Sequence, residues 1–222
     1  MKTKTLGFVH TSATLVPLFQ QLTNNYLNNV ETFNIVDDSV IKNVIKKGEL
    51  TPDTAARVVS HIQAAEAAGA DVILATCSSI GSAIETAATL CNVPVIRVDQ
   101  AMADEAVQIS NKIGVIATLP TTLEPTSDLV KRRAEAAGKE VTISSKLCEG
   151  AFEALMSGDG AKHDDMVASA LKELMNEVDV IVLAQASMSR VVDGLSEDEK
   201  IVPILASPEI AMKKLAEVYF NN

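Results

Sequence analysis

The chain is poor in residues that stack on nucleic-acid bases, and it lacks long apolar runs. Its 222 residues include no Trp, two Tyr and five Phe, which leaves few platforms for bases. Acidic residues outnumber basic ones by 29 to 19, so the net charge is −10, a sign that repels a phosphate backbone. No apolar run approaches the roughly 18 residues needed to span a bilayer. We therefore expect neither a nucleic-acid partner nor a membrane anchor.

Cysteine and histidine are scarce, with three of each. A small, odd number of cysteines does not suit a disulfide framework. The opening sequence MKTKTLGFVHTSATL lacks the apolar stretch and cleavage site of an export signal. Metal-binding spacings such as His-Glu-x-x-His or paired Cys-x-x-Cys, a Walker loop and a glycine-rich dinucleotide fingerprint are all missing from the sequence. These absences predict a cytoplasmic protein with reduced thiols that works without a cofactor.

Short runs rich in Val and Ile alternate along the chain with longer stretches of helical periodicity. Several runs are apolar at nearly every position, as strands covered on both faces must be. One helix is expected to begin at Thr51-Pro52-Asp53, a capping residue followed by proline, and to end at Gly69. This alternation predicts an α/β fold with parallel sheets. The expected strands are Thr5–Val9, Thr32–Val36, Asp71–Ala75, Val93–Val98, Ile113–Ala117, Val141–Ser144, Asp179–Leu183 and Val202–Leu205.

The two halves of the chain repeat each other. The matching pairs are Leu6–Val9 with Ile113–Ile116, Asp71–Ala75 with Asp179–Leu183, and Val93–Ile96 with Val202–Leu205. Three matches in one order at nearly constant spacing predict two related, pseudo-twofold α/β lobes. We expect residues 1–98 in lobe 1, completed by a C-terminal helix at 206–222, and residues 99–205 in lobe 2. Because ligands bind at the carboxyl ends of parallel strands, the active site is expected in the cleft between the lobes.

A polar cluster follows each of four repeated strands. Small hydroxyl residues where a strand turns into a helix cap the helix, and they also aim hydroxyls and N–H groups at a bound anion. Capping alone explains any single cluster about equally well, but four clusters around one cleft favour substrate binding. The expected substrate-binding residues are His10, Thr11, Ser12, Ser78, Ser79, Thr118, Thr121, Thr122, Ala186 and Ser187.

Cys77 is the strongest candidate for a catalytic residue. It ends a buried strand and precedes an expected helix, Ser79–Leu90, whose N-terminus would lower the pKa of the thiol and provide a base or nucleophile. The alternative is a small buried apolar residue, the commoner role of a cysteine in such a place. Cys91 fits that structural role better. Cys148, at the start of an expected helix, leaves both roles open, and the structural one is preferred.

Five other polar residues have a structural or a functional interpretation. His10 ends a strand, from where it could transfer protons or bind an anion. His61 and His163 are expected at the surface. Asp99 is expected to cap a helix at Gln100–Lys112. Arg190 is expected at the surface, with pairing to a substrate carboxylate as the alternative.

These strand ends resemble those of the aspartate/glutamate racemase superfamily of cofactor-independent enzymes, whose relatives include hydantoin racemases, maleate isomerases and arylmalonate decarboxylases. The segment Asp71–Ser79 is similar to the one that carries the family's first cysteine. The segment Ile113–Thr122 looks like the start of the second lobe, where hydroxyls hold a substrate carboxylate. The resemblance implies two α/β lobes with the site between them, often in homodimers.

The chain departs from the family pattern where family racemases carry a second cysteine, commonly as Leu-Gly-Cys-Thr. The segment Leu183–Ser187 places Gln185 there, and glutamine does not titrate. Either another group, with His10 or a bound water as candidates, supplies the second acid/base, or the reaction needs only one. Gln185 would then hydrogen-bond the substrate or orient a water.

Three functions follow from this resemblance. The preferred one is a racemase, epimerase or isomerase that deprotonates a small carboxylate or hydroxy-carbonyl compound next to its carboxyl or carbonyl group, with Cys77 as acid/base or nucleophile. The second is a carbon–carbon lyase or decarboxylase on the same scaffold. The third is a small-carboxylate-binding protein that has lost catalysis. The absence of the second thiol suggests this third function.

Overall fold

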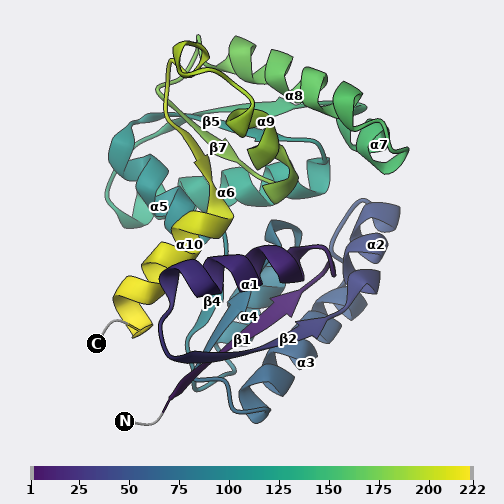
Figure 1. Ribbon diagram of the computed structural model, residues 1–222, viewed down its shortest axis with the longest axis vertical. Helices are drawn as coiled ribbons and strands as arrows, with labels where there is room; N and C mark the ends of the chain where they lie inside the picture. The colour runs from purple at the N-terminus through teal and green to yellow at the C-terminus, as the bar shows by residue number, and fades with distance from the viewer. Residues whose placement is uncertain (1–2, 221–222) are drawn as a thin grey trace. The chain divides into compact units, whose positions relative to one another are not determined.

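The computed structural model describes residues 3–220, so residues 1–2 and 221–222 of the predicted lobe 1 lie outside the described residues. The chain divides into two compact units. Unit 1 comprises the described parts of Met1–Gln100 and Pro208–Asn222, and unit 2 comprises Ala101–Ser207. Each unit holds one four-stranded parallel sheet with flanking helices (Figure 1). The predicted α/β class is confirmed, and each expected strand is found with its ends shifted by at most three residues.

The sheet of unit 1 has the strand order β2-β1-β3-β4, and all neighbouring strands are parallel. The two central strands are apolar because both their faces are covered; β3 is buried at every position. The strands are β1 (Lys4–His10), β2 (Val30–Val36), β3 (Val72–Ala75) and β4 (Val95–Arg97). The helices are α1 (Leu15–Tyr26), α2 (Asp38–Lys47), α3 (Pro52–Ala67), α4 (Gly81–Ala88) and α10 (Ser207–Leu215), which continues as a π-helical segment, Ala216–Phe220.

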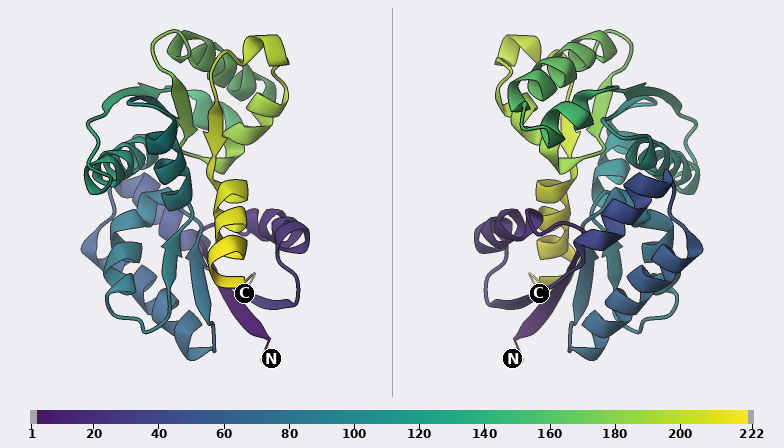
Figure 2. Two further views of the ribbon diagram at one scale, coloured as in Figure 1. Left: turned by 90° about the vertical axis from the view of Figure 1, so that its left-hand side faces the viewer. Right: turned by 90° about the vertical axis from the view of Figure 1, so that its right-hand side faces the viewer.

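Two apolar layers cover opposite faces of this sheet. Leu6 and Phe8 of β1 pack against α1 and α10, whereas Val9 of the same strand packs against α2, α3 and α4. Successive side chains of a strand point to opposite faces, so one strand supplies both layers. Figure 2 shows α1 and α10 on one side of the sheet and α3 and α4 on the other.

Unit 2 repeats this topology with the strand order β6-β5-β7-β8, again parallel throughout. Ile116 and Leu183 face a core formed with α7, α8 and α9, and alternation turns Val115 and Val182 to the opposite face. The strands are β5 (Lys112–Ala117), β6 (Thr142–Leu147), β7 (Val180–Leu183) and β8 (Ile204–Ala206). The helices are α5 (Gln100–Ile109), α6 (Pro120–Ala136), α7 (Ala151–Met156), α8 (Gly160–Leu174) and α9 (Ser189–Asp193).

The common strand order makes the strand ends of the two units comparable position by position. Val9 pairs with Ala75 in unit 1, and Ile116 pairs with Leu183 in unit 2. Residues that lie the same number of positions after these pairs are equivalent. Residues of the edge strands β4 and β8 are equivalent where they pair with equivalent residues of β3 and β7. The equivalent pairs are Thr11 and Thr118, Cys77 and Gln185, Gly81 and Ser189, and Arg97 and Ala206.

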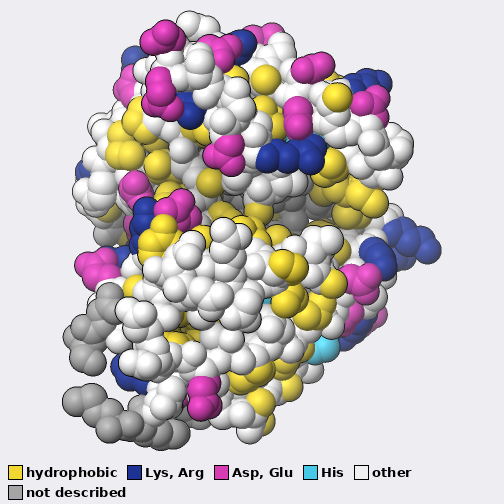
Figure 3. Space-filling model, in the orientation of Figure 1, with side chains coloured by type: hydrophobic (Ala, Val, Ile, Leu, Met, Phe, Trp, Pro, Cys, Tyr) yellow, Lys and Arg dark blue, Asp and Glu magenta, His cyan; other side chains and the backbone are white. Residues whose placement is uncertain are grey.

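The surface charge consists largely of mixed pairs. On the face drawn in Figure 3 acidic and basic side chains are interspersed. Lys213 pairs with Glu209 at 2.8 Å and Lys214 with Glu217 at 2.9 Å, all four side chains being exposed. Exposed pairs of this kind contribute about 0–1 kcal/mol each, so the two apolar layers of each unit, rather than the surface charges, stabilise the fold.

Candidate functional site

Cys77 lies two residues after the end of β3, at the carboxyl edge of the unit 1 sheet, and is half-buried. The predicted helix Ser79–Leu90 is split: a 3-10 turn, Ser78–Ile80, comes first and α4 follows at Gly81–Ala88. The thiol is hydrogen-bonded by the Thr11 hydroxyl and by both the N–H and the hydroxyl of Ser79. The structure therefore brings together three predicted site residues, Thr11, Cys77 and Ser79.

The pKa of the Cys77 thiol is raised above its ordinary value, so the predicted lowering is wrong. Burial is the main cause, and it outweighs the hydrogen bonds from Thr11 and Ser79, which act in the opposite direction; the Asp99 carboxylate adds to the rise. The turn after Cys77 is a 3-10 turn rather than the first turn of a long helix, so the expected dipole contribution does not dominate. The thiol is protonated at neutral pH in the unliganded protein.

His10 is enclosed within unit 1. Its side chain is 1% exposed, Nδ1 lies 2.8 Å from Thr76 Oγ1, and Nε2 lies 2.9 Å from Asn34 Oδ1. Its ring stacks on Phe8 with centroids 5.5 Å apart. Burial lowers the pKa of His10 below its ordinary value. With both nitrogens engaged and the imidazole neutral, His10 holds the ends of β1, β2 and β3 together and has no free nitrogen to offer a substrate.

The two remaining predicted residues of unit 1 lie in different surroundings. Ser78 is buried at the start of the 3-10 turn. Ser12 is half-buried, and its hydroxyl lies 2.8 Å from that of Thr14, just before α1. The Ser12 hydroxyl also accepts from the Thr14 N–H at 3.4 Å, within the turn that precedes α1.

The sequence analysis missed a buried ion pair near Cys77. The Arg97 guanidinium donates to both carboxylate oxygens of Asp99, Nε to Oδ1 at 3.0 Å and Nη2 to Oδ2 at 2.8 Å. Its third nitrogen, Nη1, bonds Glu85 of α4. Arg97 is 3% exposed and Asp99 0%. The Asp99 carboxylate is thus engaged by the guanidinium, and its capping of α5 stays a prediction.

In unit 2 the equivalent of the thiol is an oriented amide. Gln185 Oε1 accepts hydrogen bonds from the Thr118 N–H at 2.6 Å and from the Thr118 hydroxyl at 3.0 Å. Both Thr118 groups donate, and only the oxygen of an amide can accept. The oxygen Oε1 therefore faces Thr118, and the Nε2 group is turned away from it. Within residues 3–220 nothing accepts from Nε2, and Gln185 is half-buried. This residue can thus donate to a ligand oxygen but cannot titrate.

The other predicted residues of unit 2 differ in what they can offer. Thr121 has a buried Oγ1 with no partner in the described part of the chain, and such a hydroxyl costs about 1–3 kcal/mol, so a water or ligand oxygen would satisfy it. Thr122 is buried within α6. Ser187 is exposed and Ala186 is half-buried, both in the 3-10 turn Ala186–Met188.

His163 was expected at the surface, and that prediction is wrong. It is 0% exposed, because the positions 163, 167, 170, 171 and 174 share the face of α8 that packs on the sheet. Its Nδ1 lies 2.7 Å from the Asp164 carboxylate, which also accepts from Arg190 at 2.8 Å. Arg190 is half-exposed and is held by this carboxylate.

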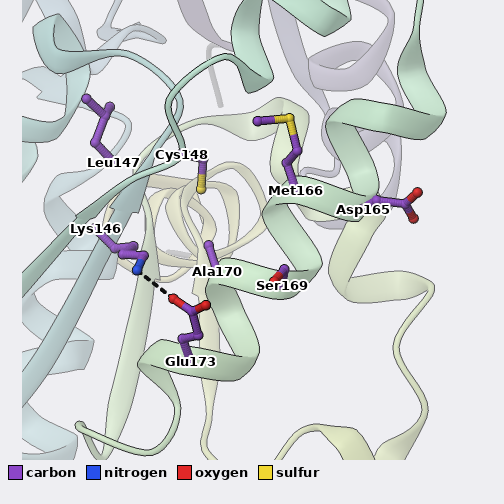
Figure 4. Close-up of a pocket in the computed structure, with 8 residues that line it drawn as sticks. All are labelled: Lys146, Leu147, Cys148, Asp165, Met166, Ser169, Ala170 and Glu173. Atoms are coloured by element: carbon purple, nitrogen blue, oxygen red, sulfur yellow. Dashed lines mark hydrogen bonds and ion pairs between the residues drawn. The ribbon is translucent and has the colours of Figure 1, made fainter.

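A depression in unit 2 does not involve the predicted site. It has a volume of about 410 Å³ and lies between the end of β6 and α8. In Figure 4 the Cys148 thiol points into it and Lys146 pairs with Glu173, at 2.6 Å. Burial raises the pKa of Cys148 to about 11, so this thiol is protonated and suits a structural role.

Among residues 3–220 there is no cluster of three or more His, Cys, Asp or Glu side chains that could hold a metal ion. Over the same range no helix combines the length and apolar character needed to cross a membrane.

Solved structures of several racemases share this fold. Glutamate racemase RacE1 from Bacillus anthracis is 17% identical, with a TM-score of 0.73 over 98% of this chain and 82% of that chain. Aspartate racemase from Picrophilus torridus is 14% identical, with a TM-score of 0.71 over 96% and 94%. Allantoin racemase from Klebsiella pneumoniae is 17% identical, with a TM-score of 0.70 over 96% and 86%. At such identities the likeness concerns the fold.

The family is decided by sequence. No curated protein sequence is similar enough to count as a relative. The sequence model of the Asp/Glu/hydantoin racemase family, however, matches residues 7–215, nearly the whole chain, and this confirms the resemblance inferred from the strand ends. The protein belongs to the Asp/Glu/hydantoin racemase family.

Proposed function

We propose that this protein is a cofactor-independent isomerase of the racemase or epimerase type, acting on a small carboxylate or hydroxy-carbonyl compound. Membership of the family supports this class of reaction. The observation that carries the proposal is the half-buried Cys77 thiol, hydrogen-bonded by Thr11 and Ser79 at the carboxyl edge of a parallel sheet, which is where α/β proteins bind ligands.

Cys77 is proposed to transfer a proton to or from the carbon next to the carboxyl or carbonyl group. A thiol with a raised pKa is a weak acid, and its thiolate is correspondingly a strong base. The donors from Thr11 and Ser79 stabilise the thiolate when it forms. A water-poor setting strengthens these hydrogen bonds, because they act in a medium of low dielectric.

Gln185 is proposed to bind the substrate rather than to exchange protons. Its oriented Nε2 can donate to a carboxylate or carbonyl oxygen, and the unpartnered Thr121 hydroxyl offers a further hydrogen bond. That the strand ends of both halves serve one substrate is part of the proposal. So are the remaining predicted binding residues Ser12, Ser78, Thr122, Ala186 and Ser187.

A lyase or decarboxylase is the second candidate, and one observation favours it. Gln185 does not titrate, and both nitrogens of His10 are engaged, so Cys77 is left without a second acid/base among the predicted residues. Loss of CO₂ from a substrate leaves a carbanion that needs only one proton donor, and a protonated thiol can supply it.

Proton NMR in D₂O tests the proposed function. A panel of small 2-substituted carboxylates and hydroxy-carbonyl compounds is incubated with wild type, Cys77→Ser and Cys77→Ala, with Cys91→Ser as the matched thiol control in the same unit. We expect deuterium to enter one carbon of a substrate with wild type and Cys91→Ser, and at least about a hundredfold slower with both Cys77 variants.

Product analysis separates the alternatives. Release of CO₂ or of a cleaved fragment would replace the isomerase with the lyase. Tight binding without exchange, unchanged in Cys77→Ala, would identify a binding protein. Full exchange with Cys77→Ser would refute the thiol chemistry.

The proposal also includes a cytoplasmic location and a homodimeric assembly. Sedimentation equilibrium tests the second point, since a monomer and a dimer of this 23.5 kDa chain differ twofold in mass.

A further inference from the structure

The buried Arg97–Asp99 pair lies beside the segment that carries Cys77. A guanidinium that is almost completely buried is costly unless its donors are satisfied. Here Asp99 takes two of the three guanidinium nitrogens and Glu85 the third. The guanidinium is therefore held in one position and orientation.

Gly81 provides the space for this guanidinium. A Cβ on Gly81 would lie 2.5 Å from Arg97 Nη2 and about as close to Cζ and Nη1, too close for any side chain. The backbone of Gly81 is ordinary helix, with φ −54° and ψ −45°, so its conformation does not require glycine. Gly81 is required because the guanidinium lies flat against its Cα, immediately after the turn Ser78–Ile80.

The second unit serves as an internal control. At the positions equivalent to Arg97 and Gly81 it has Ala206 and Ser189, and its strand end carries Gln185 in place of the thiol. The same strand order and a similar 3-10 turn form there without a buried arginine. The Arg97–Asp99 pair and Gly81 are thus not needed for the fold. They occur in the unit whose strand end carries Cys77.

Asp99 also acts on the sulfur electrostatically. Its carboxylate disfavours the thiolate and contributes to the raised pKa of Cys77. Charged groups at this place include Asp99, Arg97 of the same segment, and Glu85 of α4.

We propose that Arg97 and Asp99 are positioning residues for Cys77: the guanidinium fixes the turn from Ser78 to Gly81, and the carboxylate holds a negative charge near the sulfur. This inference deepens the proposed function, because positioning Cys77 serves catalysis only if Cys77 transfers the proton. In the unliganded protein the Asp99 carboxylate adds to the effect of burial on the thiol, while the turn holds the Ser79 donors against the sulfur.

The experiment is alkylation of the intact protein by iodoacetamide as a function of pH, with Cys77 followed by mass spectrometry of its own peptide. Asp99→Asn removes the nearby charge, so the pH midpoint of Cys77 alkylation is expected to fall; a fall of one pH unit is about tenfold faster reaction at a pH well below the midpoint. The matched control is Asp104→Asn, which removes a carboxylate paired with Arg133 in unit 2 and should leave the midpoint unchanged.

Gly81→Ala changes no charge and tests the same pair if Asp99→Asn folds poorly. The added Cβ displaces the guanidinium and with it the Ser79 donors, so the midpoint is expected to rise, whereas Ser82→Ala, at the next and exposed helix position, should not shift it. Circular dichroism checks folding. Opposite shifts in Asp99→Asn and Gly81→Ala support the proposal, because a merely structural pair would not produce them. Unchanged midpoints in both, or an equal shift in Asp104→Asn, overturn it.

This readout needs no substrate, so it is independent of the proposed function. If deuterium exchange persists in Cys77→Ser while the two alkylation shifts are found, the proposed function fails and the positioning role stands. If exchange requires Cys77 but the midpoints do not move, the positioning role fails alone.

Discussion

Gln185 and Thr118 are joined by two hydrogen bonds, from the Thr118 N–H at 2.6 Å and from its hydroxyl at 3.0 Å to the same amide oxygen. The equivalent residues of unit 1 are Cys77 and Thr11, and there the threonine hydroxyl bonds the sulfur. The two units therefore keep the threonine and differ in the group it holds. Unit 2 has an amide with a fixed orientation where unit 1 has a thiol, and the amide does not titrate.

Restoring a thiol at this position is expected to speed proton exchange. In Gln185→Cys the Thr118 donors remain to stabilise a thiolate, and a second acid/base is gained. We expect deuterium incorporation to rise by about tenfold or more relative to Gln185→Ser, which has similar size but does not titrate near neutral pH. Equal rates in the two variants would contradict a role of this position in proton transfer.

Breaking the Arg97–Asp99 pair from one side is expected to be costly. Arg97→Met leaves a fully buried carboxylate unpaired and should lower the free energy of unfolding by about 3–5 kcal/mol. The double variant Arg97→Met/Asp99→Leu leaves no such charge and should lose clearly less, as measured by urea unfolding. A double variant as unstable as the single one would show that packing, and not charge, dominates here.

Thr126 is expected to tolerate, and gain from, loss of its hydroxyl. It is 0% exposed in α6, and its Oγ1 has no partner among residues 3–220. Thr126→Val keeps the shape and removes an unsatisfied polar atom, which should stabilise the protein by about 1 kcal/mol, or roughly 2–4 °C in Tm. Ser82→Ala, at an exposed position, is the control with no expected change. A lower Tm for Thr126→Val would indicate a bound water at this hydroxyl.

Stability is expected to fall below pH 6.5 because of His10. Burial lowers its pKa in the folded state below the ordinary 6.5, so the unfolded chain binds the proton more readily. The contribution of neutral His10 is fully present above pH 6.5 and is lost as the pH falls toward the folded-state pKa, with a slope of at most about 1.4 kcal/mol per pH unit. Urea unfolding at pH 7.5 and 5.5 measures it. His10→Gln, which cannot titrate, should show a smaller difference between the two pH values, and an equal difference would exclude His10 as the cause.

Several features were predictable from the sequence because they depend on local pattern. A strand covered on both faces must be apolar at nearly every position, and β3 and β7 are buried throughout. Thr51 accepts from the Thr54 N–H and Pro52 begins α3, as expected of a capped helix start. The family was also readable, because the strand ends that carry it recur in fixed order along the chain.

Other features depend on which groups meet in space, and only the tertiary structure decided them. The polar run around His163 looks like a surface segment, yet the helix turns this one side chain inward. Asp99 follows a strand as a cap residue would, but a buried guanidinium two residues earlier takes its carboxylate. The available signal was an arginine within the apolar run Val93–Val98, two residues before Asp99. For Cys77 the sequence determined its place near a strand end. Burial determined that the pKa of its thiol is raised rather than lowered, because desolvation depends on the atoms packed around the sulfur and not on its neighbours along the chain.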